Sequence, residues 1–147
     1  MKLTAGKVSV TLIVVVAFVV GLVVILLTSG TTPTITAAKF MGALEDGDYK
    51  TLADLSHADG VPKEEFEEKW DYTMNVASKH FIFSYEIKTE TKPGKDQAVV
   101  RMMYTKNAGS NGSFPEFFDL PMVRTDDGWK VLVYEMNREM FPGLPRG

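Results

Sequence analysis

The residues from Val8 to Leu27 form an uncharged, apolar run of twenty residues, and this run constrains the fold of the chain more than any other feature. Sixteen of the twenty are Val, Leu, Ile or Phe. As an α-helix the run is about 30 Å long, which matches the hydrocarbon core of a bilayer. Each of these side chains favours the membrane interior by about 0.3 to 0.6 kcal/mol, so together they outweigh the few polar residues. The run therefore predicts a transmembrane helix over residues 8–28.

The flanks of the run indicate its orientation and whether it is retained. A cleaved secretory signal also starts with basic residues, but its apolar core is shorter, about 7 to 15 residues, and ends in an Ala-x-Ala-like site. Here Leu27 is followed by Thr-Ser-Gly, which matches such a site poorly. Lys2 and Lys7 precede the run, whereas the next charged residue after it is Lys39. By the positive-inside rule we expect a retained signal anchor in the inner or plasma membrane, with residues 1–7 cytoplasmic and the following part periplasmic or extracellular.

The exported part has the length and composition of one further domain. Residues 29–35 form a linker rich in Thr, residues 36–136 have about the commonest domain size, and residues 137–147 form a Pro/Gly-rich C-terminal tail. The whole chain has a net charge of −3 and contains no cysteine. Negative charge disfavours nucleic acid as a partner, and the lack of cysteine excludes disulfides and thiolate metal sites. The expected partners are the lipid bilayer and either other membrane-protein subunits or a second copy of the chain.

The first half of the domain has helical periodicity. Residues 37–44 place apolar side chains at positions i, i+3, i+4 and i+7, with Thr34 or Thr36 as the candidate N-cap. The same criteria predict a second helix over residues 49–55 and a third over residues 62–77. All three apolar stripes are expected to face one core.

The second half of the domain alternates between apolar and polar residues, which is typical of strands. Pro115 and Pro121 interrupt the third strand and indicate a bulge or a sheet edge. Because the strands are joined by short connections, we expect them to be antiparallel. The sequence thus predicts an α+β domain of about three helices packed on a curved four-stranded antiparallel sheet. The expected strands cover residues 80–91, 97–106, 114–125 and 129–136.

Two motifs of the domain carry a resemblance to a known superfamily. The helix opening at residues 37–41 leads into a Leu-Glu-Asp-Gly-Asp-Tyr step at residues 44–49, and the last hairpin contains Asp-Gly-Trp-Lys-Val at residues 127–131. Both resemble the nuclear transport factor 2-like (NTF2-like) superfamily of cystatin-like cones, over about residues 35–136. The superfamily includes isomerases, dehydratases and non-catalytic adaptors, so the resemblance implies a fold and leaves the function open.

The polar groups that could line the cavity of such a cone are Asp71, Tyr72, His80 and Tyr85, together with His57. Enzymes of the ketosteroid-isomerase type use an Asp base and an oxyanion hole of Tyr and protonated Asp inside the cone. In this sequence the spacing selects no base, nucleophile or triad. The two histidines are far apart and lack the spacing of metal ligands. We therefore expect no catalytic residue, metal site or cofactor.

Two further groups of residues are candidates for contacts with partners. Ala17 and Gly21 stand four residues apart in the predicted span and form a small-xxx-small pair, which favours packing of membrane helices. Met140, Phe141 and Leu144 are apolar residues in the Pro/Gly-rich tail. Either they fold back over the domain or they dock on a partner.

Two functions fit these features. The first is a non-catalytic single-pass protein whose external domain is an accessory or scaffold subunit of a larger membrane complex for secretion, the cell envelope or energy transduction. The alternative is a small-molecule-binding, isomerase-like or dehydratase-like domain that uses the cavity of the cone. The aromatic residues that would form the walls of this cavity are Phe81, Phe83, Phe117, Phe118 and Trp129.

Overall fold

The structure, a computed structural model, describes residues 30–77, 83–106, 114–138 and 143–147. The chain divides into two compact units, Met1–Gly30 and Thr31–Gly147, and the fold described below is that of the second unit. Among the described residues, no helix is long and apolar enough to cross a membrane. The predicted span at residues 8–28, including Ala17 and Gly21, lies outside the described residues and stays a prediction.

Three α-helices come first in this unit: α2 (Pro33–Asp46), α3 (Tyr49–Leu55) and α4 (Lys63–Ala77). The hydroxyl oxygen of Thr32 caps α2 by accepting a hydrogen bond from the Ile35 N–H at 3.2 Å. Neither of the predicted N-caps, Thr34 and Thr36, is the cap. Pro33 explains the earlier start, because its fixed φ and missing N–H suit the first turn of a helix. Residues 33–35 therefore belong to the helix and not to the linker.

The sheet has five strands in the order β1-β5-β4-β3-β2, and all neighbours are antiparallel except β1 and β5. The four predicted strands are present, with shifted ends. The fourth ends four residues early, because the chain turns at Val133 into a 3-10 helix, η2 (Val133–Glu135). The strands are β1 (Ser56–His57), β2 (Phe83–Gly94), β3 (Gln97–Lys106), β4 (Pro115–Thr125) and β5 (Gly128–Leu132).

The strand β1 is absent from the sequence prediction. It consists of two residues, and Ser56 pairs with Val131 while His57 pairs with Leu132 in parallel. Two residues are too few to show the alternation by which strands are recognised. This pairing extends the sheet to a fifth strand and joins the end of α3 to β5.

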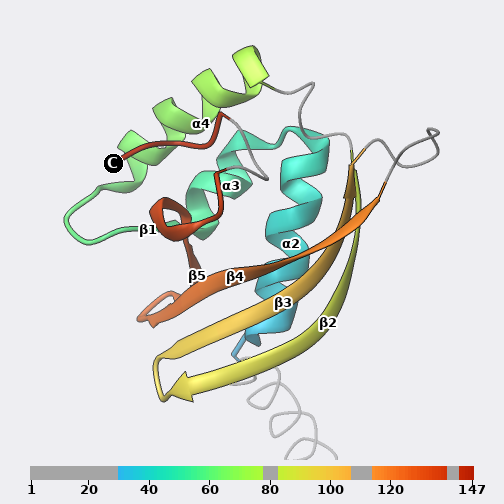
Figure 1. The fold of residues 1–147 in the computed structure, drawn as a ribbon. Helices are drawn as coiled ribbons and strands as arrows, with labels where there is room; N and C mark the ends of the chain where they lie inside the picture. The colour runs from blue at the N-terminus through green and yellow to red at the C-terminus, as the bar shows by residue number, and fades with distance from the viewer. Residues whose placement is uncertain (1–29, 78–82, 107–113, 139–142) are drawn as a thin grey trace, which may run out of the picture. The chain divides into compact units, whose positions relative to one another are not determined.

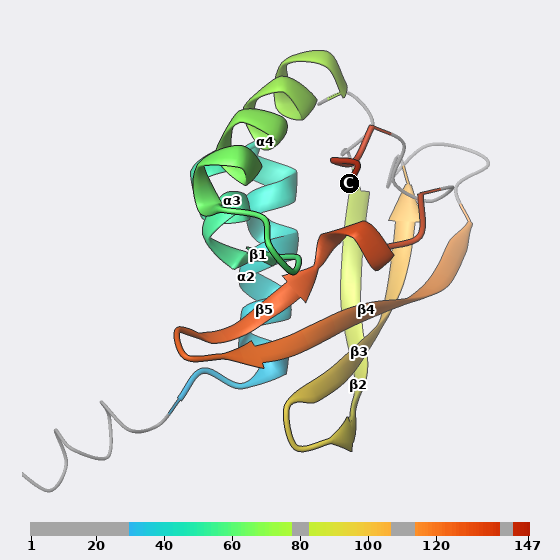
Figure 2. The same ribbon diagram turned by 90° about the vertical axis from the view of Figure 1, so that its left-hand side faces the viewer.

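The helices lie on one face of the curved sheet, with α2 running across it (Figures 1 and 2). The inward residues of β3 and β4 meet this helical layer and form one apolar core with it. Its largest fully buried side chains are Trp70, Tyr104, Phe40, Phe66, Met41, Leu44, Leu52, Met102, Leu120, Met122 and Val100. The α+β architecture predicted from the sequence is confirmed, with five strands in place of four.

One half of β4 is an edge of the sheet among the described residues. On its β3 side β4 is paired from Pro115 to Val123, but on its β5 side pairing is confined to the stretch from Met122 to Thr125. Pro121 therefore stands immediately before the first residue that pairs with β5. Of the two alternatives for the interrupted strand, a bulge or an edge, the structure shows the edge.

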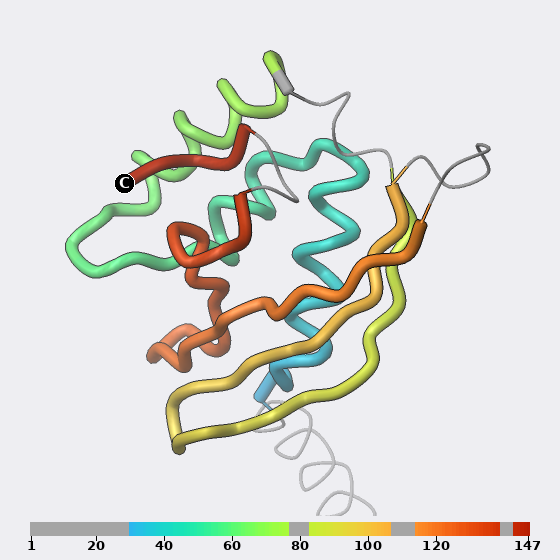
Figure 3. The backbone as a smooth tube through the Cα atoms, in the orientation of Figure 1, coloured from blue at the N-terminus to red at the C-terminus, as the bar shows by residue number. Residues whose placement is uncertain are grey.

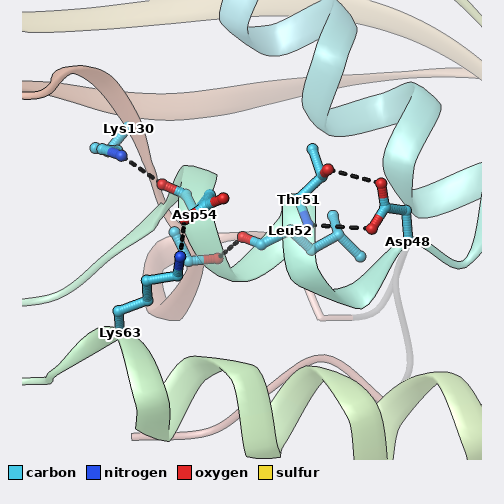
Figure 4. A network of polar contacts seen from close by, with 7 residues as sticks. Asp48, Thr51, Leu52, Asp54, Lys63 and Lys130 are labelled. Atoms are coloured by element: carbon cyan, nitrogen blue, oxygen red, sulfur yellow. Dashed lines mark hydrogen bonds and ion pairs between the residues drawn. The ribbon is translucent and has the colours of Figure 1, made fainter.

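Polar contacts at the surface connect α3 with the start of α4 and with β5 (Figure 4). The Asp54 carboxylate forms an ion pair with Lys63 of α4, and the Asp54 carbonyl accepts a hydrogen bond from Lys130 of β5. At the other end of α3, Asp48 caps the helix by accepting from the N–H of Thr51 at 3.2 Å and from its hydroxyl at 2.6 Å.

Candidate functional site

The space between helices and sheet is filled by apolar side chains. Trp70 of α4 lies edge-on to Phe40 of α2, with ring centroids 5.9 Å apart. Its indole N–H donates to the Ser56 hydroxyl at 2.8 Å, and that hydroxyl donates to the Leu52 carbonyl at 2.6 Å. The polar chemistry of this region is therefore a closed chain of hydrogen bonds that satisfies a buried indole. Among the described residues, the buried polar or charged side chains are Thr36, Ser56 and Thr73, none of them an acid, a base or a histidine.

Tyr104 is the one phenol placed deep in this core. It lies in β3 opposite Tyr85 of β2, so both rings come from the inward face of the sheet. Burial, helped by the negative charge of Glu116, raises the pKa of Tyr104 to about 12. The phenol is thus neutral at physiological pH. Its signal in the sequence is its inward position in the alternating pattern of β3, which alone does not distinguish it from an apolar residue.

The predicted cavity groups do not meet at one site. Asp71 and Tyr72 lie on the outside of α4, and Tyr72 is 70% exposed. They follow Trp70 by one and two residues, so the helix rotates them by about 100° and 200° from this inward side chain. The prediction that Asp71 and Tyr72 line the interior is therefore wrong. His80 lies outside the described residues.

Tyr85 is partly buried, and its hydroxyl donates to the carbonyl of Ala38 at 3.1 Å. Burial, with a contribution from the Glu45 charge, raises its pKa. His57 pairs in β1 and lies 3.5 Å from Asp59 at the surface. The two residues therefore do not belong to one site, and no described group of three or more His, Cys, Asp or Glu side chains is placed to hold a metal ion.

The aromatic residues expected in the walls of a cavity are mostly core residues. Phe83, Phe118 and Trp129 are at most 7% exposed, and the Phe83 and Tyr104 rings pack with centroids 5.0 Å apart. Phe117 points away from the core and is 54% exposed. Phe81 lies outside the described residues. These rings fill the interior instead of enclosing an open space.

Polar side chains converge instead on the segment Gly143–Gly147, which we call the tail segment. Figure 3 traces its backbone beside α4. The Thr73 hydroxyl donates to the Gly143 carbonyl at 3.0 Å, and the Lys69 ammonium donates to the Arg146 carbonyl at 2.7 Å. Arg138 donates to the two carbonyls between them, at 3.1 Å and 2.6 Å. Four consecutive main-chain carbonyls, those of residues 143–146, are thus each held by a side-chain donor.

The surface that holds this segment is formed by Lys69 and Thr73 of α4, by Tyr134 of η2 and by Arg138, and we call it the tail groove. Lys69 is its centre, since its ammonium also donates to the Tyr134 hydroxyl at 2.9 Å and pairs with Glu65 at 2.8 Å. The hydrogen bonds from Lys69, first to Glu65 and then to Tyr134, raise its pKa. The ammonium therefore stays charged and able to donate.

Leu144 is buried in the apolar core at 3% exposure, and Pro145 is buried beside it. Of the two alternatives for the tail, the structure shows folding back for Leu144, so this residue is not free to dock on a partner. The physical reason is that the tail groove provides hydrogen-bond donors for the carbonyls of the segment. The Leu144 side chain can therefore be buried without leaving these carbonyls unsatisfied. Met140 and Phe141 lie outside the described residues.

Open space remains on both sides of the tail segment. A cleft of about 430 Å³ is lined by α4 residues, including Glu68 and Tyr72, and by residues 143–146. A second cleft of about 440 Å³ adjoins Tyr134 and Gly147 and extends to Asp59 and Glu135. The tail segment therefore lines two separate clefts, one along α4 and one at Gly147.

Sequence reasoning identified Leu144 as an interacting residue but missed Lys69, Thr73, Tyr134 and Arg138. The available signal was weak: Lys69 and Thr73 are four residues apart and so share one face of α4. Their acceptors are main-chain carbonyls, which every residue carries and which no sequence motif reveals.

No protein-family model and no curated protein matches the sequence. Solved structures with a similar fold include a ketosteroid isomerase-like protein from Erwinia carotovora atroseptica, at 20% identity over 65% of this chain and 85% of that chain, with a TM-score of 0.47. An NTF2-like protein of unknown function from Shewanella oneidensis matches at 15% identity over 65% and 88% of the two chains, with a TM-score of 0.45. A domain of unknown function with a cystatin-like fold from Nostoc punctiforme matches at 10% identity over 69% and 75%, with a TM-score of 0.47. These likenesses concern the fold alone, and they identify no reaction or partner of this chain.

Proposed function

We propose that this chain is a non-catalytic accessory subunit of a larger membrane complex, anchored by the span at residues 8–28. The observation that carries the proposal is the contrast between the interior and the tail groove. The buried polar or charged side chains of the described interior include no acid, base or histidine, whereas three side chains of the tail groove hold four carbonyls of a polypeptide backbone. Side-chain donors that line up along a backbone are typical of sites that bind protein segments.

The position of the tail groove supports this role. The second unit starts at Thr31, whose hydroxyl lies against the β4–β5 turn, 3.2 Å from where a Cβ on Gly128 would stand. In Figures 1 and 2 the start of α2 lies at one end of the unit, and α4 with the tail segment lies at the other. A domain tethered through Thr31 to a membrane span thus has its tail groove at the end remote from the tether. We propose that the N-terminus is cytoplasmic and that the domain faces a partner in the periplasm or outside the cell.

The anchor is tested by a charge in the middle of the predicted span. Val16→Arg costs about 2.5 to 3.5 kcal/mol in insertion free energy, and we expect the variant to be released by alkaline carbonate while the natural chain stays in the membrane pellet. Val16→Leu is the matched control and should stay in the pellet. A mature N-terminus near Thr31 in mass spectrometry would contradict the anchor.

The accessory role is tested by photo-crosslinking in cells. A photoreactive amino acid at exposed Tyr72 is expected to yield an adduct with another membrane protein, and the same probe at exposed Thr89, on β2, serves as control. The membrane protein captured in the adduct should also co-purify with the natural chain in mild detergent. Extraction as a free monomer, with no adduct from Tyr72, would overturn the proposal.

A further inference from the structure

We propose that the tail groove is a recognition site for an extended segment of a partner protein, of the form Gly-Leu-Pro followed by basic residues, and that the tail segment is its exchangeable resident occupant. This inference rests on the proposed function, since it names the chemistry of the partner that the accessory domain binds.

The tail groove binds the main chain of its occupant. Thr73, Arg138 and Lys69 donate to the carbonyls of residues 143–146, and a carbonyl in an extended segment of any protein offers the same acceptor. Extended segments are commonly bound in this manner, with main-chain hydrogen bonds for affinity and a few pockets for specificity. A foreign segment with its carbonyls at the same positions would therefore satisfy the same donors.

Three positions of the tail segment determine which sequences fit the groove. Leu144 and Pro145 are buried, so the groove contains a pocket shaped for an apolar residue followed by proline. Gly143 has a φ of 91°, in the left-handed region that favours glycine. A competing segment should therefore also carry Gly-Leu-Pro at these positions.

The charges around the segment favour a basic partner. The cleft on the α4 side includes Glu68 and also Lys69, whose ammonium pairs with Glu65. The cleft that Gly147 lines includes Asp59 and Glu135. The residue after Pro145 in the resident segment is Arg146, which lines the first of these clefts. Acidic side chains on both sides of the segment favour basic residues after the Leu-Pro pair. The second cleft, which Gly147 lines, is the place for the residues that follow these positions in a partner segment.

The test uses the chain in nonionic detergent and a fluorescein-labelled synthetic peptide with the sequence of residues 139–147. A truncated chain that ends at Pro142 keeps all three donor residues, Lys69, Thr73 and Arg138, and should bind the peptide saturably in fluorescence polarisation. The full chain should bind at least about tenfold more weakly, because its own segment competes at a high effective concentration. The peptide in which the residue at position 144 is aspartate is the matched control and should not bind. Absence of binding to the truncated chain would overturn the proposal, and so would equal binding to the full chain.

A second variant keeps the test decisive if truncation disturbs folding. Full-length Leu144→Asp should displace the segment while keeping the chain length, and it should bind the natural peptide like the truncated chain. Adding Lys69→Ala and Thr73→Val to Leu144→Asp should abolish binding. If both Leu144→Asp and the truncated chain lose cooperative unfolding, the segment is required for folding and is not exchangeable, which would also overturn the proposal.

The preference for basic residues is tested by comparing the affinities of two extended peptides. The peptide extended by three lysines should bind the truncated chain at least about threefold more tightly than the peptide extended by three glutamates, at low ionic strength. Asp59→Asn combined with Glu135→Gln should remove this difference. Equal affinity of both peptides for the unmodified truncated chain would overturn the preference for basic residues. Because these measurements need only the purified chain, their failure is distinguishable from a failure of crosslinking in cells, which tests the accessory role itself.

Discussion

The core around Trp70 and the tail groove differ in how they satisfy polar groups. Inside, one indole N–H and one hydroxyl form a closed chain that ends on the Leu52 carbonyl. In the tail groove, three side chains share four carbonyls of a segment that is partly open to solvent. The hydrogen bonds in the core allow the Trp70 indole to be buried with its N–H satisfied. Those in the tail groove hold a backbone segment without full burial of the charged donor groups. This difference indicates that the core contributes more to stability than the groove does, and it agrees with the role in recognition that we propose for the groove.

The largest expected effect on stability comes from a substitution in the core around Trp70. Trp70→Ala should lower the free energy of unfolding by about 3 to 5 kcal/mol, because it removes the largest buried side chain and leaves a cavity. Urea denaturation of the chain in nonionic detergent measures it. Tyr72→Ala, at a 70% exposed position on the same helix, should change stability by less than about 0.5 kcal/mol. A similar loss in both variants would show that α4 does not divide into a core face and an outer face.

A smaller loss is expected where the tail groove meets the core. Leu144→Ala should cost about 2 kcal/mol, at the lower end of the range for buried leucines, because it lies in a segment that can shift to fill the space. Arg146→Ala is the control, since the groove binds its carbonyl, and it should leave the urea midpoint nearly unchanged. A loss as large as that of Trp70→Ala would mean that the segment is an integral part of the core.

Removing the hydrogen-bond acceptor of the indole tests whether the polar contacts of the core contribute to its stability. Ser56→Ala leaves the Trp70 N–H buried without its acceptor, which should cost about 1 to 2 kcal/mol. Ser56→Thr retains the hydroxyl and serves as the comparison in the same urea experiment. If Ser56→Ala is neutral, the indole is satisfied in another way and the closed chain is not a determinant of stability.

The smallest effect concerns a surface contact that belongs to neither region. Thr34 donates its hydroxyl to Glu90 at 2.6 Å and its N–H at 3.0 Å, and the hydroxyl contributes most to a lowered pKa of this carboxyl group. The contribution of Glu90 to stability is therefore present above the ordinary pKa of 4.5 and is lost as the pH falls through the lower pKa of the folded chain. Thr34→Val should raise the pKa of Glu90 in an NMR titration, while Thr34→Ser should leave it low. No change in Thr34→Val would assign the shift to the remaining N–H and to Lys92.

The sequence predicted the helices and long strands well because their apolar faces are long enough to show a period. It failed where structure depends on contacts distant in the chain. The predicted strand at residues 129–136 stops at Leu132, yet Val133 and Met136 are still buried, so the apolar residues alone did not reveal the turn into η2. The start of α2 was missed because two threonines near Thr32 are equally plausible caps.

The candidate site was less predictable than the fold. The expected interior groups were chosen by residue type, and Asp71 and Tyr72 are chemically suitable but lie on the outer face of α4. The period of α4 in the sequence already placed Trp70 inward, and applying the helical turn to its neighbours would have corrected this. The tail groove was not predictable, since Lys69 and Arg138 act on carbonyls of residues that only the fold brings next to them.

The edge of β4 has a consequence for how this domain behaves in a crowded compartment. An unpaired strand edge is a template on which neighbouring chains add strands and aggregate. Here the half that lacks a β5 partner begins with Pro115 and ends with Pro121, and neither residue has an N–H to offer an incoming strand. A foreign strand would lose hydrogen bonds at both ends of this short stretch. The same prolines that interrupt the sequence pattern therefore help to keep copies of the domain apart.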